Sequence, residues 1–124
     1  METGISINKH LYSILKSNDK INEYVNGNIY PIVAEEDTKF PFITFTKTDV
    51  FGSYSKDGWE YDTVPFTVSI VANDYITTVE IAEIVRNLFD WRHNSYFKKV
   101  EFKGCTESYS NSVYVQTLNF SATI

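Results

Sequence analysis

The first 27 residues place apolar side chains at helical spacing. One stripe of four apolar residues falls at positions i, i+4, i+7 and i+8, on a single face of a helix. It consists of Ile7, Leu11, Ile14 and Leu15. A polar break at 17–19 separates it from a second short helical piece. Ser6 and Asp19 are the predicted N-caps, because their side-chain oxygens can accept from free N–H groups. Gly27 is the predicted stop, because glycine tolerates the left-handed conformation found there.

After this glycine the apolar period shortens to two, which is typical of strands. Strands are predicted at 29–33, 42–48 and 64–72. The third has one apolar and one mostly polar face, as expected for a sheet that is buried on one side. Pro41 opens the second strand, and Pro65 predicts that the third begins, or has one side, at a sheet edge. Residues 51–58 contain glycine, serine and charged side chains, and are predicted to connect two strands.

A long second helix is predicted after Asp74, whose carboxylate is a natural N-cap. Its wide apolar stripe is made of Val79, Ile81, Ala82, Ile84, Val85, Leu88 and Phe89. The helix is predicted to end near 91–94, where His93 would act as a cation at the helix C-terminus. Two strands close the chain, at 97–105 and 112–124, with a hairpin turn predicted at 107–112.

The predicted element order is helix, three strands, helix, two strands, in one domain that spans residues 1–124. A helix with such a wide apolar stripe should lie flat on a sheet. We therefore predict an α+β fold. It is a two-layer sandwich in which two helices pack on one mostly antiparallel sheet of about five strands.

Charge and composition limit the classes of function. The formal net charge is −5, whereas a protein that grips nucleic-acid phosphates needs surplus lysine and arginine. The charge argues against nucleic-acid binding, but not against DNA that slides past without sticking. No apolar run approaches the roughly 20 residues of a membrane span. The single cysteine excludes an internal disulfide, and a cytoplasmic product is expected.

No arrangement of residues is typical of catalysis. Cys105 has no histidine near it in sequence and is predicted to be a buried, inert thiol. His10 and His93 lack metal-ligand spacing, and the five glycines are scattered rather than forming a phosphate-binding loop. The carboxylates of Glu35 and Glu36 lie in a predicted loop, where nothing would raise a pKa for acid catalysis. We predict that the protein is not an enzyme and holds no cofactor or metal.

Three segments carry a resemblance to a known family. They are LYSILKSNDKINEYVNGNIYPIV at 11–33, FPFITF at 40–45 and VPFTVSIVANDYITTVEIAEIVRNLFD at 64–90. Together they resemble the tail-completion family of tailed phages and prophages, whose members are related to tail terminators and tail-to-head joining proteins. The shared motifs are hydrophobic signatures of a fold. Residues 51–61 and those after 94 match only in pattern.

The resemblance implies a structural role in virion assembly. Members of the family form a ring, usually a hexamer, that docks on the end of the tail tube, stops its growth and faces the head. The implied partners are further copies of the chain, the major tail tube protein and the head-side connector protein. DNA would pass through the lumen without specific binding, and no membrane is involved. The protein would be made in the host cytoplasm and reside in the tail or neck of the virion.

A closed ring needs a head-to-tail interface between two different surfaces. Three groups of residues are candidates for contact with a neighbouring subunit or the tail tube: Glu35, Glu36 and Asp37; Phe51, Tyr54 and Trp59; Lys98 and Lys99, with Lys103. The lysines would fit an acidic neighbour, even the 35–37 loop of the next subunit. The alternatives are a solvated turn for the acidic group, aromatics folded onto the core, and lysines that protect an edge strand from aggregation.

Two other hypotheses stay open. The first is a head-completion adaptor at the same neck, which the sequence does not separate from a terminator. The second is an unrelated small cytoplasmic binding domain or enzyme that shares an α+β sandwich. Tail-tube and tape-measure genes beside this gene would favour the tail-completion hypothesis over the second.

Overall fold

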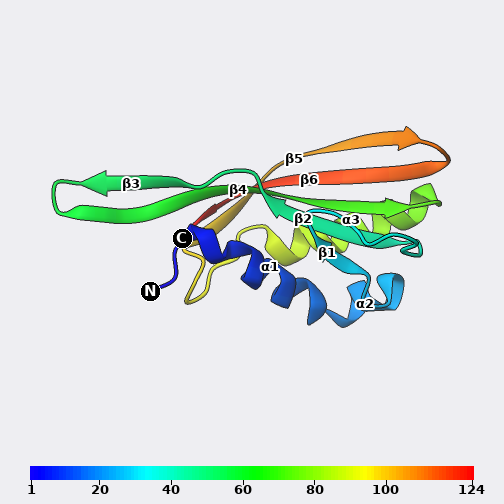
Figure 1. Ribbon diagram of the computed structural model, residues 1–124, viewed down its shortest axis with the longest axis horizontal. Helices are drawn as coiled ribbons and strands as arrows, with labels where there is room; N and C mark the ends of the chain where they lie inside the picture. The colour runs from blue at the N-terminus through cyan, green and yellow to red at the C-terminus, as the bar shows by residue number, and fades with distance from the viewer.

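The computed structural model describes all 124 residues and shows three helices packed on one mixed sheet of six strands (Figure 1). The elements are a 3-10 turn Gly4–Ser6, α1 Ile7–Lys16, α2 Asp19–Val25, β1 Ile29–Pro31, β2 Phe42–Lys47, β3 Phe51–Ser55, β4 Gly58–Ala72, α3 Tyr75–Phe89, β5 Lys99–Ser110 and β6 Val113–Thr123. The predicted α+β class is confirmed. The sheet has one strand more than predicted, because 51–55 is a strand.

The strand order is β1-β2-β4-β6-β5, and β3 pairs with the first part of β4. Only β1 and β2 run parallel, and every other pair is antiparallel. The central strand β4 is 15 residues long and therefore has room for two partners on one side, first β3 and then β2. This arrangement leaves β1, β3 and β5 as the strands with a free edge.

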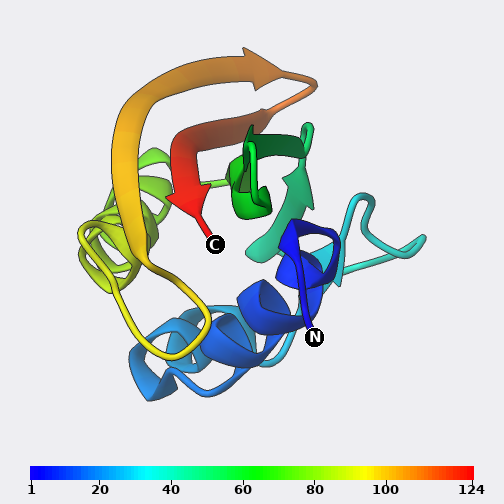
Figure 2. The ribbon, with the colours of Figure 1, turned by 90° about the vertical axis from the view of Figure 1, so that its left-hand side faces the viewer.

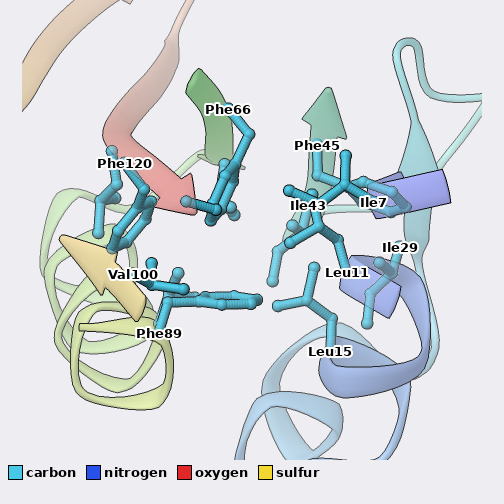
Figure 3. Packing of buried hydrophobic residues seen from close by; sticks show 14 of the residues in the cluster. Ile7, Leu11, Leu15, Ile29, Ile43, Phe45, Phe66, Phe89, Val100 and Phe120 are labelled. Atoms are coloured by element: carbon cyan, nitrogen blue, oxygen red, sulfur yellow. The ribbon is translucent and has the colours of Figure 1, made fainter. Parts of the chain in front are cut away.

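One apolar core fills the space between the sheet and the helices (Figure 3). Helix α1 packs on β1 and β2, and α3 packs on β4, β6 and β5. Phe66 stacks on Phe120 with ring centroids 5.1 Å apart, and Phe89 of α3 meets both rings at 5.6 Å. Burial of each such side chain contributes roughly 1.5–3 kcal/mol, so this aromatic cluster is a main tie between the two layers.

The helix N-caps agree with the sequence prediction at one helix and differ from it at two. Ser6 stands at the N-cap of α1, but its side chain makes no capping hydrogen bond. The N-cap of α2 is Asn18 rather than Asp19, and its side chain accepts from the N–H of Ile21. Asp74 caps α3 as predicted, because its carboxylate accepts from the N–H of Thr77 at 3.0 Å.

The end of α3 and the last hairpin differ from the prediction. The helix ends at Phe89, and the guanidinium of Arg92 donates to the carbonyl of Leu88, the role predicted for His93. The hairpin turn is confined to 111–112, whereas β5 continues to Ser110. Both turn residues have positive φ, which matches the twist of a two-residue hairpin turn and explains its shortness.

Pro65 lies in the interior strand β4, but one side of β4 has no strand partner at this position, as the predicted open side requires. Its carbonyl accepts from the N–H of Thr48 at 2.9 Å, which directs this peptide toward the side of β2 and β3. At this level β2 has already ended with Lys47 opposite Phe66, and β3 begins only at Phe51. The missing N–H therefore falls in the gap between two partner strands, where no ladder bond is lost.

Candidate assembly surfaces

Strands β3 and β4 form a hairpin that projects beyond the rest of the sheet (Figure 1). We call residues 51–62 the hairpin arm. The neighbouring strands stop at its base, where Thr63 of β4 lies opposite Thr123 of β6, which in turn lies opposite Lys99 of β5. Past this level the arm is a two-stranded ribbon. Such a ribbon is marginally stable by itself, which makes the arm a candidate for contact with another molecule.

The three predicted aromatic anchors all lie on the arm, in strands rather than in a loop. Phe51 is 54% exposed and Tyr54 is 72% exposed. Trp59 is half-buried and folds back toward the base, where its indole N–H donates to Asp62 at 2.8 Å. The arm thus presents two aromatic side chains to solvent and uses the third for its own support.

Asp62 fixes the base of the arm and was not found from the sequence. Its carboxylate is 95% buried and accepts from the backbone N–H of Gly4 at 2.7 Å as well as from Trp59. A Cβ on Gly4 would stand 2.5 Å from Val64, so only glycine brings the N-terminal segment this close. The alternation of residues along β4 could have identified Asp62, because position 62 shares the buried face of this strand with Val64.

The acidic loop, residues 32–41, connects the parallel strands β1 and β2. Glu35, Glu36 and Asp37 are exposed, as the sequence predicted. Two apolar side chains, Ile32 and Val33, are 71% and 72% exposed beside them. The loop is held at both ends, because the N–H of Ile32 donates to the carbonyl of Phe45 at 2.8 Å and the side chain of Asn28 donates to the carbonyl of Lys39 at 3.3 Å.

The basic edge, which we define as Lys98, Lys99 and Lys103, lies at the start of β5. The ammonium of Lys98 donates to the carbonyl of Glu60 on the arm and lies 5.7 Å from the ring centroid of Tyr61. Lys99 and Lys103 approach the carboxylate of Glu101 at 3.6 and 3.8 Å. These pairs are exposed and therefore contribute little to stability. Residues 98–103 contain three lysines and one carboxylate, so this edge has a net positive charge.

The structure does not bring the acidic loop and the basic edge together within one chain. The loop joins β1 and β2 at one side of the sheet, and β5 is the outermost strand at the other side (Figure 2). Opposite charges on opposite sides of a subunit suit a head-to-tail contact between copies.

A hydrogen-bonded cluster between α3 and β5 also escaped the sequence analysis. Glu107 accepts from the hydroxyl of Tyr75 and from the amide of Gln116, both at 2.6 Å. These two bonds lower the pKa of Glu107, with Tyr75 the larger cause, and the same contact raises the pKa of Tyr75. Gln116 is buried and lies on the core face of β6, where a polar residue among apolar ones was the available signal.

Beside this cluster a shallow groove of about 250 Å³ separates α3 from β5. Its apolar floor and walls include Val79, Ala82, Phe102 and Leu118. Arg86 lies along one wall, with its guanidinium 4.1 Å from the ring centroid of Phe102. The groove exists because the predicted apolar stripe of α3 is wider than the part that the sheet covers, so that Val79 and Ala82 stay partly exposed.

Cys105 also lines this groove and is exposed, which corrects the prediction of a buried thiol. Partial desolvation and the nearby Glu107 raise the pKa of the thiol, so its reactive thiolate form is disfavoured. His10 stacks on Tyr96 with ring centroids 3.7 Å apart and contacts the carboxylate of Glu2. No group of three or more metal-ligating side chains comes together, and no helix is long and apolar enough to cross a membrane.

Comparisons with known proteins place this geometry in a structural context. No protein-family model and no curated protein sequence matches the chain. Among solved structures, the fold is similar to a chain of "Virion of native gene transfer agent (GTA) particle", with a TM-score of 0.77 and 16% identical residues. The similarity covers 91% of this chain and 90% of that chain. At this identity the similarity shows a shared α+β fold over almost the whole of both chains.

Proposed function

We propose that this protein is a structural component of a phage-like particle that acts at the head-proximal end of the tail, as a tail terminator or tail-to-head joining protein. The observation that carries the proposal is the full-length likeness in fold to a chain of a gene transfer agent virion. The resemblance of 11–33, 40–45 and 64–90 to the tail-completion family supports the same role.

In this function the protein works by forming surfaces, without catalysis. Copies of the chain assemble into a ring, a hexamer by analogy with the family, that contacts the major tail tube protein on one side and the head-side connector protein on the other. DNA passes through the lumen without specific binding, and the net charge of −5 suits such passage because like charges repel. A basic lumen in an assembled ring would contradict this part of the proposal.

The acidic loop and the basic edge have opposite charge and lie on opposite sides of the subunit, which supports a head-to-tail contact between copies. We propose that the acidic loop of one subunit meets the basic edge of the next. Opposite charges steer this encounter and fix its register more than they add affinity. The exposed Ile32 and Val33 add apolar area to the charged loop, and an interface core is formed by side chains of this kind.

Electron microscopy of particles made without this gene product tests the function. If the protein is a terminator, its absence should give tail tubes of abnormal length, because nothing stops their growth. If it is a joining protein, its absence should give tubes of normal length that lack heads. A head-completion adaptor at the neck predicts defective heads beside normal tails, and fully normal particles would exclude all three roles.

A further inference from the structure

The three strands with a free edge differ in how well they are protected from pairing. β1 has only three residues and ends in Pro31, which donates no backbone hydrogen bond. The first half of β5 carries Lys99 and Lys103 and has a bulge before Gly104. Lysines and bulges are the usual devices that keep an edge strand from adding another strand.

Two free edges lack charged guards. β3 has the sequence FGSYS, without a charge or a proline. Its pairing with β4 shifts register between Ser53 and Tyr54, where the extra residue, Glu60, belongs to β4 and not to the free edge. The second half of β5, residues 105–110, contains one charge, Glu107, which is turned toward Tyr75 and Gln116 on the helix side. Exposed and unguarded edges of this kind are sites where strands of another chain add.

We propose that β3 on the hairpin arm of one copy pairs with the edge of β5 at 105–110 on a second copy, and that Tyr54 of the arm enters the groove between α3 and β5. This inference rests on the proposed function, since it names the contact by which the ring would close. It commits to a second copy of this chain as the occupant of the groove.

The topology makes this contact head-to-tail. β3 lies on the β2 side of β4, whereas β5 is the last strand on the β6 side, so that the two edges are on opposite sides of one sheet. Gly52 lies opposite Asp62, which belongs to the buried, helix-side face of β4. Tyr54 shares this face with Gly52, since its ring lies 2.9 Å from the position of a Cβ on that glycine. A strand added beside β5 would therefore direct Tyr54 over α3, into the groove.

Size favours a protein side chain in the groove. Its volume of about 250 Å³ is below the 300–1,000 Å³ that is typical of small-molecule sites. Arg86 lines the groove together with Glu83 and Glu107, so the apolar floor rather than net charge selects the side chain that enters. An exposed tyrosine that fills an apolar pocket is a common interface anchor.

The native cysteine permits a direct test. Cys105 is the only cysteine of the chain and lines the groove, and Ser55 is exposed at the end of β3 next to Tyr54. Purified Ser55→Cys protein is treated with a short bismaleimide and separated on a denaturing gel. The proposal predicts a ladder of dimer, trimer and larger species that ends in a closed ring. Addition of Tyr54→Ala should shift the ladder to about tenfold higher protein concentration, as expected for loss of an interface anchor.

Matched variants separate this contact from random collision. Lys20→Cys places a thiol on exposed α2, away from the arm, and should give no ladder with Cys105. Ser55→Cys combined with Cys105→Ser can link only arm to arm and should stop at dimers. Circular dichroism confirms that each variant is folded. A monomer at every concentration, or a ladder equal to that of Lys20→Cys, would overturn the proposal.

The two proposals fail in different ways. If Ser55→Cys gives no ladder although deletion of the gene alters tail length, the arm contact is wrong and the proposed function stands. If the ladder forms but deletion leaves normal particles, the chain self-associates through the arm and the proposed function is wrong.

Discussion

At the scale of single residues, Asp62 determines how the hairpin arm joins the core. It is a buried carboxylate that accepts from Gly4 and Trp59, which lie far apart in the sequence. We expect Asp62→Ala to lower the free energy of unfolding by roughly 2–4 kcal/mol, because two donors would lose their buried acceptor. Urea unfolding measures this loss.

The matched control is Glu60→Ala, an exposed carboxylate on the same strand, which should change the free energy of unfolding by no more than about 0.5 kcal/mol. Equal losses in the two variants would show that Asp62 has no special role at the base of the arm.

Glu107 gives a second residue-scale prediction, on pH. Its pKa is lowered from the ordinary 4.5, first by Tyr75 and then by Gln116. A lowered pKa in the folded state means that the stabilisation is present above the ordinary value and is lost as the pH falls through the lowered one. Tyr75→Phe should therefore raise the titration midpoint of Glu107, followed by NMR, and should destabilise the protein at neutral pH but not in strong acid.

Tyr24→Phe is the control for this titration, because Tyr24 makes the same kind of bond to Glu80 at 2.6 Å. It should leave the midpoint of Glu107 unchanged. A midpoint that Tyr75→Phe does not move would show that the hydroxyl is not the main cause of the low pKa.

At the scale of elements, the β5–β6 hairpin has a turn whose residues fit it imperfectly. Asn111 and Ser112 both have positive φ, and serine is strained there whereas glycine is not. We expect Ser112→Gly to stabilise the protein by roughly 0.5–1 kcal/mol, which thermal unfolding would show as a rise of a few degrees.

Ser110→Gly, two residues earlier, should have the opposite effect and cost roughly 0.5–1 kcal/mol, because Ser110 lies in strand β5. If both glycine variants stabilise the protein, or both destabilise it, the geometry of the turn does not limit the stability of this hairpin.

At the scale of the whole molecule, assembly should depend on the acidic loop and the basic edge as a pair. The double change Glu35→Lys, Glu36→Lys should abolish association, and so should Lys98→Glu, Lys99→Glu, because each brings like charges together. An equimolar mixture of the two variants should associate again, since every contact then joins opposite charges. Sedimentation velocity measures the species present.

The dependence of association on salt concentration checks the charge-reversal experiment. Association that depends on exposed charges should weaken as the ionic strength rises, because the Debye length falls to about 8 Å near physiological salt. A mixture that stays monomeric would mean that the loop and the edge do not meet in the assembly.

The sequence by itself determined the class of fold and most of the core. Helical and strand periodicity identified Ile7, Leu11 and Leu15, and the alternation from 64 to 72, all of which reach the core as predicted. Local patterns succeed here because burial on one face repeats with the period of the element. The acidic loop was also predictable, since three adjacent carboxylates have no place in a core.

Only the tertiary structure decided how the candidate surfaces are built. The FGSYS segment has the composition of a connection, and becomes a strand because the long β4 offers it a free side for pairing. Asp62 and Gln116 look misplaced along the chain until partners distant in sequence satisfy them. Periodicity records which face of an element is buried, whereas the partner of a strand edge or of a buried polar group is set by contacts that form only when distant segments meet.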